Sequence, residues 1–347
     1  MKISKCIIDD ASLVLDVLKM IDQLPSLQTV FVLDSQDKVV GTVTDGDIRR
    51  ALIRGLTTKD KVTDVMHQNF SYLEENEVDL NKISDFRRKK LKGVPLISAK
   101  GNLLKVYDFT KTKSILPIDA VIMAGGRGER LRPLTDTVPK PLLKVGGKEI
   151  ISYNFDRLLQ FGITNQTVTV NYLGDQIDDF CKDYNSEINF NIVKEDKFLG
   201  TAGSLSLIED FNNDVILLMN SDLLTDIDYE DFYKSFIKNE ADILVASVPY
   251  PVSIPYAIFE NEDLKVKSFK EKPEYIYYAN AGIYLIKRKA LNLIPKDEFY
   301  NATDLMEKII ELDMKLIHYP MHNYWLDFGK PADFKKANED INNLKFK

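Results

Sequence analysis

The segment that most constrains the fold is an apolar run that passes directly into a loop rich in glycine, proline and basic residues. It reads VIMAGGRGERLRPLTDTVPKPLLKVGG over residues 121–147. The apolar run has the character of a buried strand, and the glycines after it let backbone N–H groups approach a phosphate or a base closely. The segment therefore indicates a phosphate-binding or nucleotide-binding loop at the end of a strand.

Residues 117–347 alternate strand-like and helix-like patterns. We expect strands at Asp119–Ala124, Gln166–Val170, Asn189–Val193, Val215–Met219, Ile243–Ser247, Tyr256–Glu260 and Ala281–Ile286. We expect helices at Glu149–Phe161, Gly203–Glu209, Tyr229–Asn239, Thr303–Leu312 and Ala332–Leu344. The alternation predicts an α/β fold, a Rossmann-like and mostly parallel sheet with helices on both faces. Ligands of such sheets bind beyond the C-terminal ends of the strands.

Two common phosphate-binding motifs do not match the glycine-rich loop. A dinucleotide fingerprint needs a third glycine where Leu131 stands, and a P-loop needs Gly-Lys-Ser/Thr, which does not follow. The loop instead continues as Arg130-Leu-Arg-Pro-Leu-Thr135 and then Pro139-Lys-Pro141. The loop must therefore be interpreted together with this continuation.

That whole string resembles the signature of the sugar-1-phosphate nucleotidyltransferases, GGxGxRLxPLT followed by PKP, and the resemblance extends over residues 118–347. It implies that Arg130 binds the nucleotide phosphates and that Lys140 neutralises charge at the reacting phosphates. Family members usually carry Thr or Ser where Glu129 stands, so we expect this acid to point outward. The resemblance also implies nucleotide-lining residues at Ala124, Gly125, Gly126 and Gly128.

Two aspartates follow strand-like segments and match the metal ligands of that family. Asp222 ends VILLMNSD, although the family usually has Gly where Ser221 stands, and Asp327 lies in WLDFG. Mg²⁺ prefers a few carboxylate oxygens together with phosphate oxygens and water, so two aspartates suffice. The resemblance therefore implies a Mg²⁺ cofactor held by Asp222 and Asp327, with Asp222 also in a catalytic role beside Arg130 and Lys140.

Other segments resemble the substrate-binding parts of the family. Glu195 and the stretch GTAGS match its nucleotide-side segment, and a helix from Gly203 would offer further N–H groups. Ala257 stands where a glycine is common, which narrows the space near the sugar. The resemblance implies nucleotide contacts at Glu195, Gly200 and Thr201, and sugar-phosphate contacts at Glu271, Lys272 and Asn280.

The reaction that the resemblance implies joins a nucleoside triphosphate (NTP) to a sugar 1-phosphate, with release of pyrophosphate. The attacking phosphate oxygen is already anionic, so no Ser-His-Asp set is needed, and none is evident in a chain with 3 histidines. A carboxylate at Glu195 can accept two hydrogen bonds from guanine, which favours GTP; UTP, dTTP and CTP remain alternatives. With its additional N-terminal part, described below, the chain resembles the guanylyltransferases for glucosamine 1-phosphate and heptose 1-phosphates.

The N-terminal part contains an internal repeat. VFVLDSQDKVVGTVTDGD at 30–47 aligns with VPLISAKGNLLKVYDFTK at 94–111 at a constant offset of 64 residues. Each copy reads strand, polar turn, strand. Amphipathic helices accompany the copies at Ala11–Leu24, Asp47–Arg54 and Val78–Leu91.

Copy one, with its ending GTVTDGD, resembles a cystathionine-β-synthase-type (CBS) domain, and the pair resembles a CBS tandem. This divides the chain into a first CBS domain at 1–56, a degenerate second one at 57–113 and the transferase domain at 117–347. In that family a Thr and an Asp three residues on, here Thr44 and Asp47, hold a regulatory nucleotide; the alternative is a helix N-cap. Copy two has Asp108 and Lys111 there instead. CBS tandems usually pair, so we expect a homo-oligomer.

An alternative class of function is a non-catalytic nucleotide sensor, in which the CBS pair binds the nucleotide and the transferase fold is inactive.

The net charge of −7 argues against nucleic-acid or membrane binding as the main task. The 2 cysteines cannot form a disulfide framework, and the N-terminus shows no signal peptide. We therefore expect a cytoplasmic protein.

Overall fold

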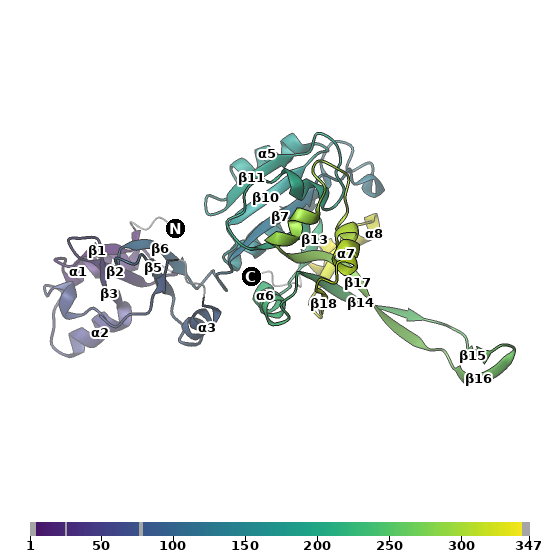
Figure 1. Cartoon of the computed structure of the whole chain (residues 1–347). Helices are drawn as coiled ribbons and strands as arrows, with labels where there is room; N and C mark the ends of the chain where they lie inside the picture. The colour runs from purple at the N-terminus through teal and green to yellow at the C-terminus, as the bar shows by residue number, and fades with distance from the viewer. Residues whose placement is uncertain (1–4, 25, 76–78, 342–347) are drawn as a thin grey trace. The chain divides into compact units, whose positions relative to one another are not determined.

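The computed structural model describes residues 5–24, 26–75 and 79–341 (Figure 1). The chain forms two compact units, one of Met1–Leu116 with Gln160–Gly162 and one of Pro117–Leu159 with Ile163–Lys347. Each unit has its own sheets and its own buried core, and each is described here by itself.

The first unit contains two three-stranded sheets of the same topology, in which a parallel pair is followed by an antiparallel hairpin. The hairpins carry register shifts at Val32/Leu33 and Leu96/Ile97, which are 64 residues apart. The repeat is therefore visible in the backbone down to the position of a β-bulge. The strands are β1 (Ile7–Asp9), β2 (Thr29–Leu33), β3 (Val39–Thr44), β4 (Leu73–Glu74), β5 (Gly93–Ile97) and β6 (Leu103–Asp108).

The two repeats differ in their helices and in the size of their cores. The first has α1 (Val14–Asp22), α2 (Asp45–Ile53) and the short η2 (Val62–Asp64), and it buries Phe31 and Ile48 in a large apolar cluster. The second has α3 (Leu80–Arg88) over a smaller cluster; the predicted start of this helix at Val78 lies outside the described residues. No helix corresponds to α2 within residues 109–117, because there the chain leads into the second unit.

The second unit is built on a seven-stranded sheet in the order β11-β10-β7-β12-β17-β14-β18. Only β17 runs antiparallel to its neighbours, so the predicted mostly parallel sheet is confirmed. The strands are β7 (Ile118–Ala124), β10 (Asn165–Val170), β11 (Asn189–Lys194), β12 (Val215–Asn220), β14 (Ile243–Ser253), β17 (Glu274–Lys287) and β18 (Leu316–Pro320).

Both faces of this sheet are covered. On one face Ile216 and Leu218 of β12 share a buried cluster with Leu305 and Ile309 of a helix. The intervening Leu217 points to the other face because side chains alternate along a strand, and it is fully buried as well. The helices are α4 (Ile150–Gln160), α5 (Gly174–Lys182), α6 (Tyr229–Lys238), α7 (Ala302–Glu311) and α8 (Pro331–Asp340), with short turns η3 (Glu129–Leu131), η4 (Lys140–Leu142), η5 (Gly203–Leu207) and η6 (Arg288–Leu293).

Two helix predictions and one helix that was not predicted need comment. The helix expected over Gly203–Glu209 is wrong, because only the five-residue 3-10 helix η5 forms there. The helix α5 was not predicted, since its sequence GDQIDDFCK has few apolar residues. The predicted C-terminal helix corresponds to α8, and its last residues, 342–344, lie outside the described residues.

A long ribbon extends from this sheet. Strands β14 and β17 continue beyond it as a two-stranded arm, which carries the hairpin of β15 (Ile258–Glu262) and β16 (Lys265–Lys270) at its tip (Figure 1). The strand expected at Tyr256–Glu260 therefore belongs to the arm and not to the central sheet. Two further small sheets pair β8 (Lys144–Val145) with β9 (Lys148–Glu149) and β13 (Leu223–Thr225) with β19 (Trp325–Asp327).

Two sequence expectations concern location. Among the described residues, every helix is too short or too polar to cross a membrane. Cys6 and Cys181 are both buried, and burial raises the pKa of the Cys6 thiol to about 11 and that of the Cys181 thiol to about 12. Neither thiol is therefore set up to react as a thiolate near neutral pH.

Candidate active site

A cleft of about 390 Å³ lies at the C-terminal ends of β7 and β12. This is the position that a parallel α/β sheet favours for a ligand. The structure brings most of the predicted transferase residues together there. The predicted residues that line the cleft are Ala124, Gly125, Gly126, Gly128, Arg130, Lys140, Glu195, Gly200, Thr201 and Asp222.

The glycine-rich loop approaches its neighbours too closely for side chains at two positions. A Cβ on Gly125 would lie 3.0 Å from Glu195 Oε1, and Gly128, at φ +62°, would place one 3.0 Å from a methyl carbon of Thr135. The Thr135 hydroxyl donates to the Gly128 carbonyl at 2.9 Å and holds the turn. Nothing lies within 4 Å of a Cβ position at Gly126, which lines the cleft, so the loop backbone is open to a ligand at this position.

The two predicted metal aspartates are far apart in sequence and are brought together by one strand pairing. Asp222 follows β12 and immediately precedes β13, which pairs antiparallel with β19 so that Leu223 lies opposite Asp327. The Phe328 N–H donates to the Asp222 carbonyl at 3.3 Å. The carboxylates at 222 and 327 therefore belong to one site, although Asp327 is not itself in the cleft lining.

Lys140 forms ion pairs with both aspartates. Its ammonium contacts Asp222 Oδ2 and lies 3.8 Å from Asp327 Oδ1, and the residue is 9% exposed. Burial raises the pKa of Asp327, and the negative charge of Asp222 raises it further, while Lys140 and Arg130 oppose the shift. The site thus holds two like charges in a half-buried place, where Lys140 forms ion pairs with both and the positive charge of Arg130 adds to the compensation at Asp327.

This donor set fits Mg²⁺. Two carboxylates with space in the adjoining cleft leave coordination positions for phosphate oxygens and water, as this small, hard cation requires. Burial and the nearby charge of Asp222 both raise the pKa of Asp327, and a bound cation would oppose both effects. The described residues contain no group of three or more His, Cys, Asp and Glu side chains arranged for a metal ion, so further ligands would have to come from substrate oxygens or water.

Glu195 and its neighbours form another part of the cleft lining. Glu195 is 6% exposed, burial raises its pKa, and its carboxylate accepts a hydrogen bond from the Leu199 N–H at 3.0 Å. The Thr201 hydroxyl accepts from the Ala302 N–H at 2.8 Å, at the start of α7. The Thr201 hydroxyl therefore makes a hydrogen bond within the protein. The helix expected from Gly203 is only the short turn η5, so it offers few N–H groups.

The three residues predicted for the sugar phosphate do not line the cleft. Glu271 and Lys272 lie on the arm and are exposed. The Asn280 side chain donates to the Tyr284 hydroxyl at 2.9 Å and accepts from the Gly282 N–H at 2.9 Å, which fixes it within β17. Their substrate contacts stay predictions, and Glu271 and Lys272 require the arm to bend toward the cleft.

Sequence reasoning left out several lining residues. Asn220 and Ser221 line the cleft between β12 and Asp222, and their position after an apolar strand was an available signal. Phe198 also lines it, is 50% exposed and lies with its ring centre 5.9 Å from that of Phe299. Glu129 was considered from the sequence and expected to point outward; it is exposed, but it lies in the cleft lining, with its carboxylate 3.9 Å from the Arg132 guanidinium.

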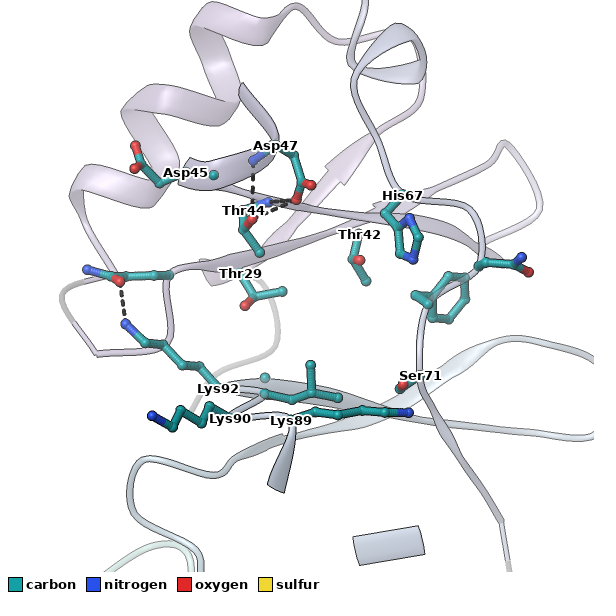
Figure 2. A pocket seen from close by; sticks show the side chains of 16 residues that line it. Thr29, Thr42, Thr44, Asp45, Asp47, His67, Ser71, Lys89, Lys90 and Lys92 are labelled. Carbon is teal, nitrogen blue, oxygen red and sulfur yellow. Dashed lines mark hydrogen bonds between the residues drawn. The ribbon is translucent and has the colours of Figure 1, made fainter. Parts of the chain in front are cut away.

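The pair predicted for the regulatory nucleotide lies in the first unit, beside a second cleft of about 600 Å³ (Figure 2). Thr44 is the N-cap of α2, and Asp47 Oδ2 accepts from both the Thr44 N–H at 2.8 Å and the Thr44 hydroxyl at 2.6 Å. Arg50 adds an ion pair at 2.7 Å. Burial alone would raise the pKa of Asp47, but these hydrogen bonds outweigh it and lower the pKa.

Comparison with known proteins agrees with this geometry. Residues 119–343 match the model of the nucleotidyl transferase family, and the chain belongs to that family. It is 33% identical over 226 residues to a probable mannose-1-phosphate guanylyltransferase 1 of Oryza sativa subsp. japonica, and 31% identical over 226 residues to a mannose-1-phosphate guanyltransferase of Schizosaccharomyces pombe. Each match covers 62% of this chain and 62% of the relative.

A solved structure is similar as well. A putative glucose-1-phosphate thymidylyltransferase from Bacillus anthracis, crystallised with sucrose, is 26% identical and superposes with a TM-score of 0.53. The similarity covers 66% of this chain and 97% of that one. The match supports the Rossmann-like nucleotidyltransferase fold of the second unit.

The raised pKa of Asp327 generates a stability prediction. In the folded protein the ionised form of Asp327 is disfavoured, so ionised Asp327 lowers the free energy of unfolding at pH values above its folded-state pKa. Below the ordinary value of 3.8 the carboxyl is protonated in both the folded and the unfolded state, and this cost vanishes. We expect Asp327→Asn to unfold at a higher temperature than the wild type at pH 7 without divalent cations, with no gain at about pH 3.5. Scanning calorimetry of the wild type and the variant at the two pH values measures these unfolding temperatures.

The matched control is Asp263→Asn, at an exposed turn of the arm between β15 and β16, which we expect to leave the unfolding temperature unchanged. An Asp327→Asn variant that is less stable than the wild type at pH 7 would contradict the assigned charge balance.

Proposed function

We propose that this protein is a sugar-1-phosphate nucleotidyltransferase, which makes an NDP-sugar and pyrophosphate from an NTP and a sugar 1-phosphate. The observation that carries the proposal is the contact of Lys140 with both Asp222 and Asp327 beside the glycine-rich loop, in a chain of the nucleotidyl transferase family. A cleft with this arrangement can bind a polyphosphate through lysine, arginine and backbone N–H groups.

In this reaction an anionic oxygen of the sugar phosphate attacks the α-phosphorus of the NTP in line, and the bond to the pyrophosphate oxygen breaks. Catalysis rests on holding the two substrates in position and on stabilising the charge that develops. Arg130 binds the triphosphate, and Lys140 neutralises charge at the reacting phosphates. Mg²⁺ held by Asp222 and Asp327 would supply further charge neutralisation when bound.

We propose GTP as the nucleotide. The carboxylate of Glu195 lines the cleft, and such a group accepts hydrogen bonds from guanine N1–H and N2–H₂ together, whereas uracil and thymine offer only one ring N–H. Curated relatives named as mannose-1-phosphate guanylyltransferases support this choice, while the similar solved structure is named as a thymidylyltransferase. UTP, dTTP and CTP therefore stay as alternatives, and we assign no particular sugar 1-phosphate.

The direct test is a pyrophosphate-release assay of the full chain with GTP, UTP, dTTP and CTP, each with several sugar 1-phosphates and Mg²⁺. We expect turnover that is fastest with GTP. We expect Asp222→Asn to reduce it at least about 100-fold, equivalent to about 2.7 kcal/mol, because a metal ligand is lost. No turnover with any pair would favour the non-catalytic sensor instead.

We further propose that Glu271, Lys272 and Asn280 serve the sugar phosphate. Lys272→Ala should raise the KM for the sugar 1-phosphate at least about tenfold and leave the KM for the NTP nearly unchanged, because one charge-assisted hydrogen bond is lost. Steady-state kinetics measures both constants. Lys265→Ala on the same arm is the control, and equal changes in both KM values for Lys272→Ala would exclude the role.

For the first unit we propose a CBS tandem that binds a regulatory nucleotide beside Thr44 and Asp47 and that pairs two chains into a homo-oligomer. Two sheets of equal topology at a 64-residue offset support the tandem. Leu13 and Leu15 at the start of α1 are 39% and 42% exposed, which supports pairing through this helix. A monomer in light scattering would contradict the pairing. Two buried cysteines that form no disulfide framework suit a reducing cytoplasm.

A further inference from the structure

The arm of the second unit has a stem in which two strands run side by side without a third. The stem consists of residues 248–253 of β14 and residues 274–279 of β17, and Figure 1 shows it projecting from the central sheet. Among the described residues, β18 pairs with β14 only as far as Ser247, and β12 pairs with β17 only from Ile283. All residues from 249 to 280 are exposed or half-buried. A two-stranded ribbon of this kind is at best marginally stable by itself in water.

The sequence of the stem is typical of a ribbon that is covered on its faces. Residues 243–259 and residues 275–286 contain no Asp, Glu, Lys or Arg. An antiparallel ribbon with one face in water alternates apolar and polar residues, whereas here apolar and aromatic side chains occupy both faces. Charged side chains return only near the tip, where Lys270 and Glu260 form an ion pair at 2.8 Å. The stem therefore lacks the charges that keep an exposed ribbon from associating.

The two faces of the stem differ in what the chain itself places against them. Residues directly opposite each other share a face, so Tyr250 and Tyr277 lie on one face, together with Val252, and Tyr278 lies on the other. The ring centre of Tyr278 is 5.1 Å from that of His318 on β18, so part of its face is covered. Tyr250 and Tyr277 are exposed. We call the face of Tyr250, Val252 and Tyr277 the tyrosine face.

The aromatic surface of the arm is large enough for a stable interface. Five aromatic side chains are 61–74% exposed, namely Tyr250, Tyr256, Phe259, Phe269 and Tyr277. A whole aromatic side chain buries roughly 150–250 Å², so these five expose on the order of 600 Å² in each chain. Each partner in a standard interface contributes about 800 Å². The five side chains therefore supply most of what one side of such an interface needs.

A second copy of this chain fits the tyrosine face better than a partner selected by charge. The stem has no charged group to attract such a partner, and two identical uncharged faces meet without repulsion. A two-fold axis brings the same patch of both chains together, and tyrosine is enriched among the residues that dominate binding energy. Pro249 and Pro251 lack N–H donors, which protects the β14 edge against strand addition, so we expect the contact at the face instead of this edge.

We propose that the arm is an interaction surface for a second copy of this chain, in which the tyrosine faces of two arms pack against each other. The contact gives a ribbon without a core of its own the packing that it lacks. It is separate from the pairing proposed for α1, because it uses the other unit of the chain. The inference goes beyond the proposed transferase reaction and does not depend on it.

The test is analytical ultracentrifugation of the full chain over a dilution series. Every sample carries Leu13→Lys/Leu15→Lys, because these substitutions at exposed positions oppose pairing through α1. We expect this chain to self-associate, and we expect its dissociation constant to rise at least tenfold when Tyr250→Lys/Tyr277→Lys is added. The added substitutions remove two aromatic contacts and place like charges against each other.

Two further variants serve as controls. Ile310→Lys/Leu312→Lys adds the same two charges at exposed apolar positions near the C-terminal end of α7, outside the arm, and should leave association unchanged. Tyr250→Phe/Tyr277→Phe keeps both rings and should retain association. Circular dichroism establishes that each variant is folded, and Tyr250→Ser/Tyr277→Ser replaces the arm lysine variant if that one does not fold.

The outcomes are distinct. A chain with an intact arm that stays monomeric at every concentration overturns the proposal, and so does an equal dissociation constant with and without the arm substitutions. Lysines on α7 that weaken association as much as lysines on the stem also overturn it, because the effect would then be one of net charge. Pyrophosphate release by the same variants, with Mg²⁺ present, reports on the transferase site separately.

Discussion

The cleft of the second unit depends on one buried charge arrangement, in which the ammonium of Lys140 lies between Asp222 and Asp327. Two carboxylates held together in a half-buried place repel each other; burial raises the pKa of Asp327, and the negative charge of Asp222 raises it further. Lys140 reduces the repulsion, and the pairing of β13 with β19 keeps the carboxylates in place against it. A polyphosphate with its cation would find both signs of charge already positioned there.

The surrounding structure serves this arrangement. The parallel strands β7 and β12 end at the same edge of the sheet, so the glycine-rich loop and Asp222 emerge side by side. Thr135 fixes the turn at Gly128, and no side chain stands between the loop backbone and the cleft at Gly126. The residues proposed to bind the phosphates and the cation therefore lie at neighbouring parts of one edge.

Much of this cleft could be predicted from sequence, because the loop, Arg130, Lys140 and Asp222 lie in short motifs that follow apolar strands. Asp327 was found from its own short motif, but only the strand pairing explains why it lies near Asp222. Tertiary structure decided the rest. The arm places Glu271 and Lys272 away from the cleft, and the helix expected from Gly203 is a short 3-10 turn.

The central claim is that Asp222 and Asp327 form one cation site that a bound triphosphate completes. Electron paramagnetic resonance of Mn²⁺ with the full chain and a non-hydrolysable GTP analogue tests it most directly. The account predicts Mn²⁺ bound in the presence of the analogue, with an affinity at least about tenfold weaker in Asp327→Asn, as expected for the loss of one charged ligand. Equal Mn²⁺ affinity in the wild type and in a folded Asp327→Asn variant would contradict it.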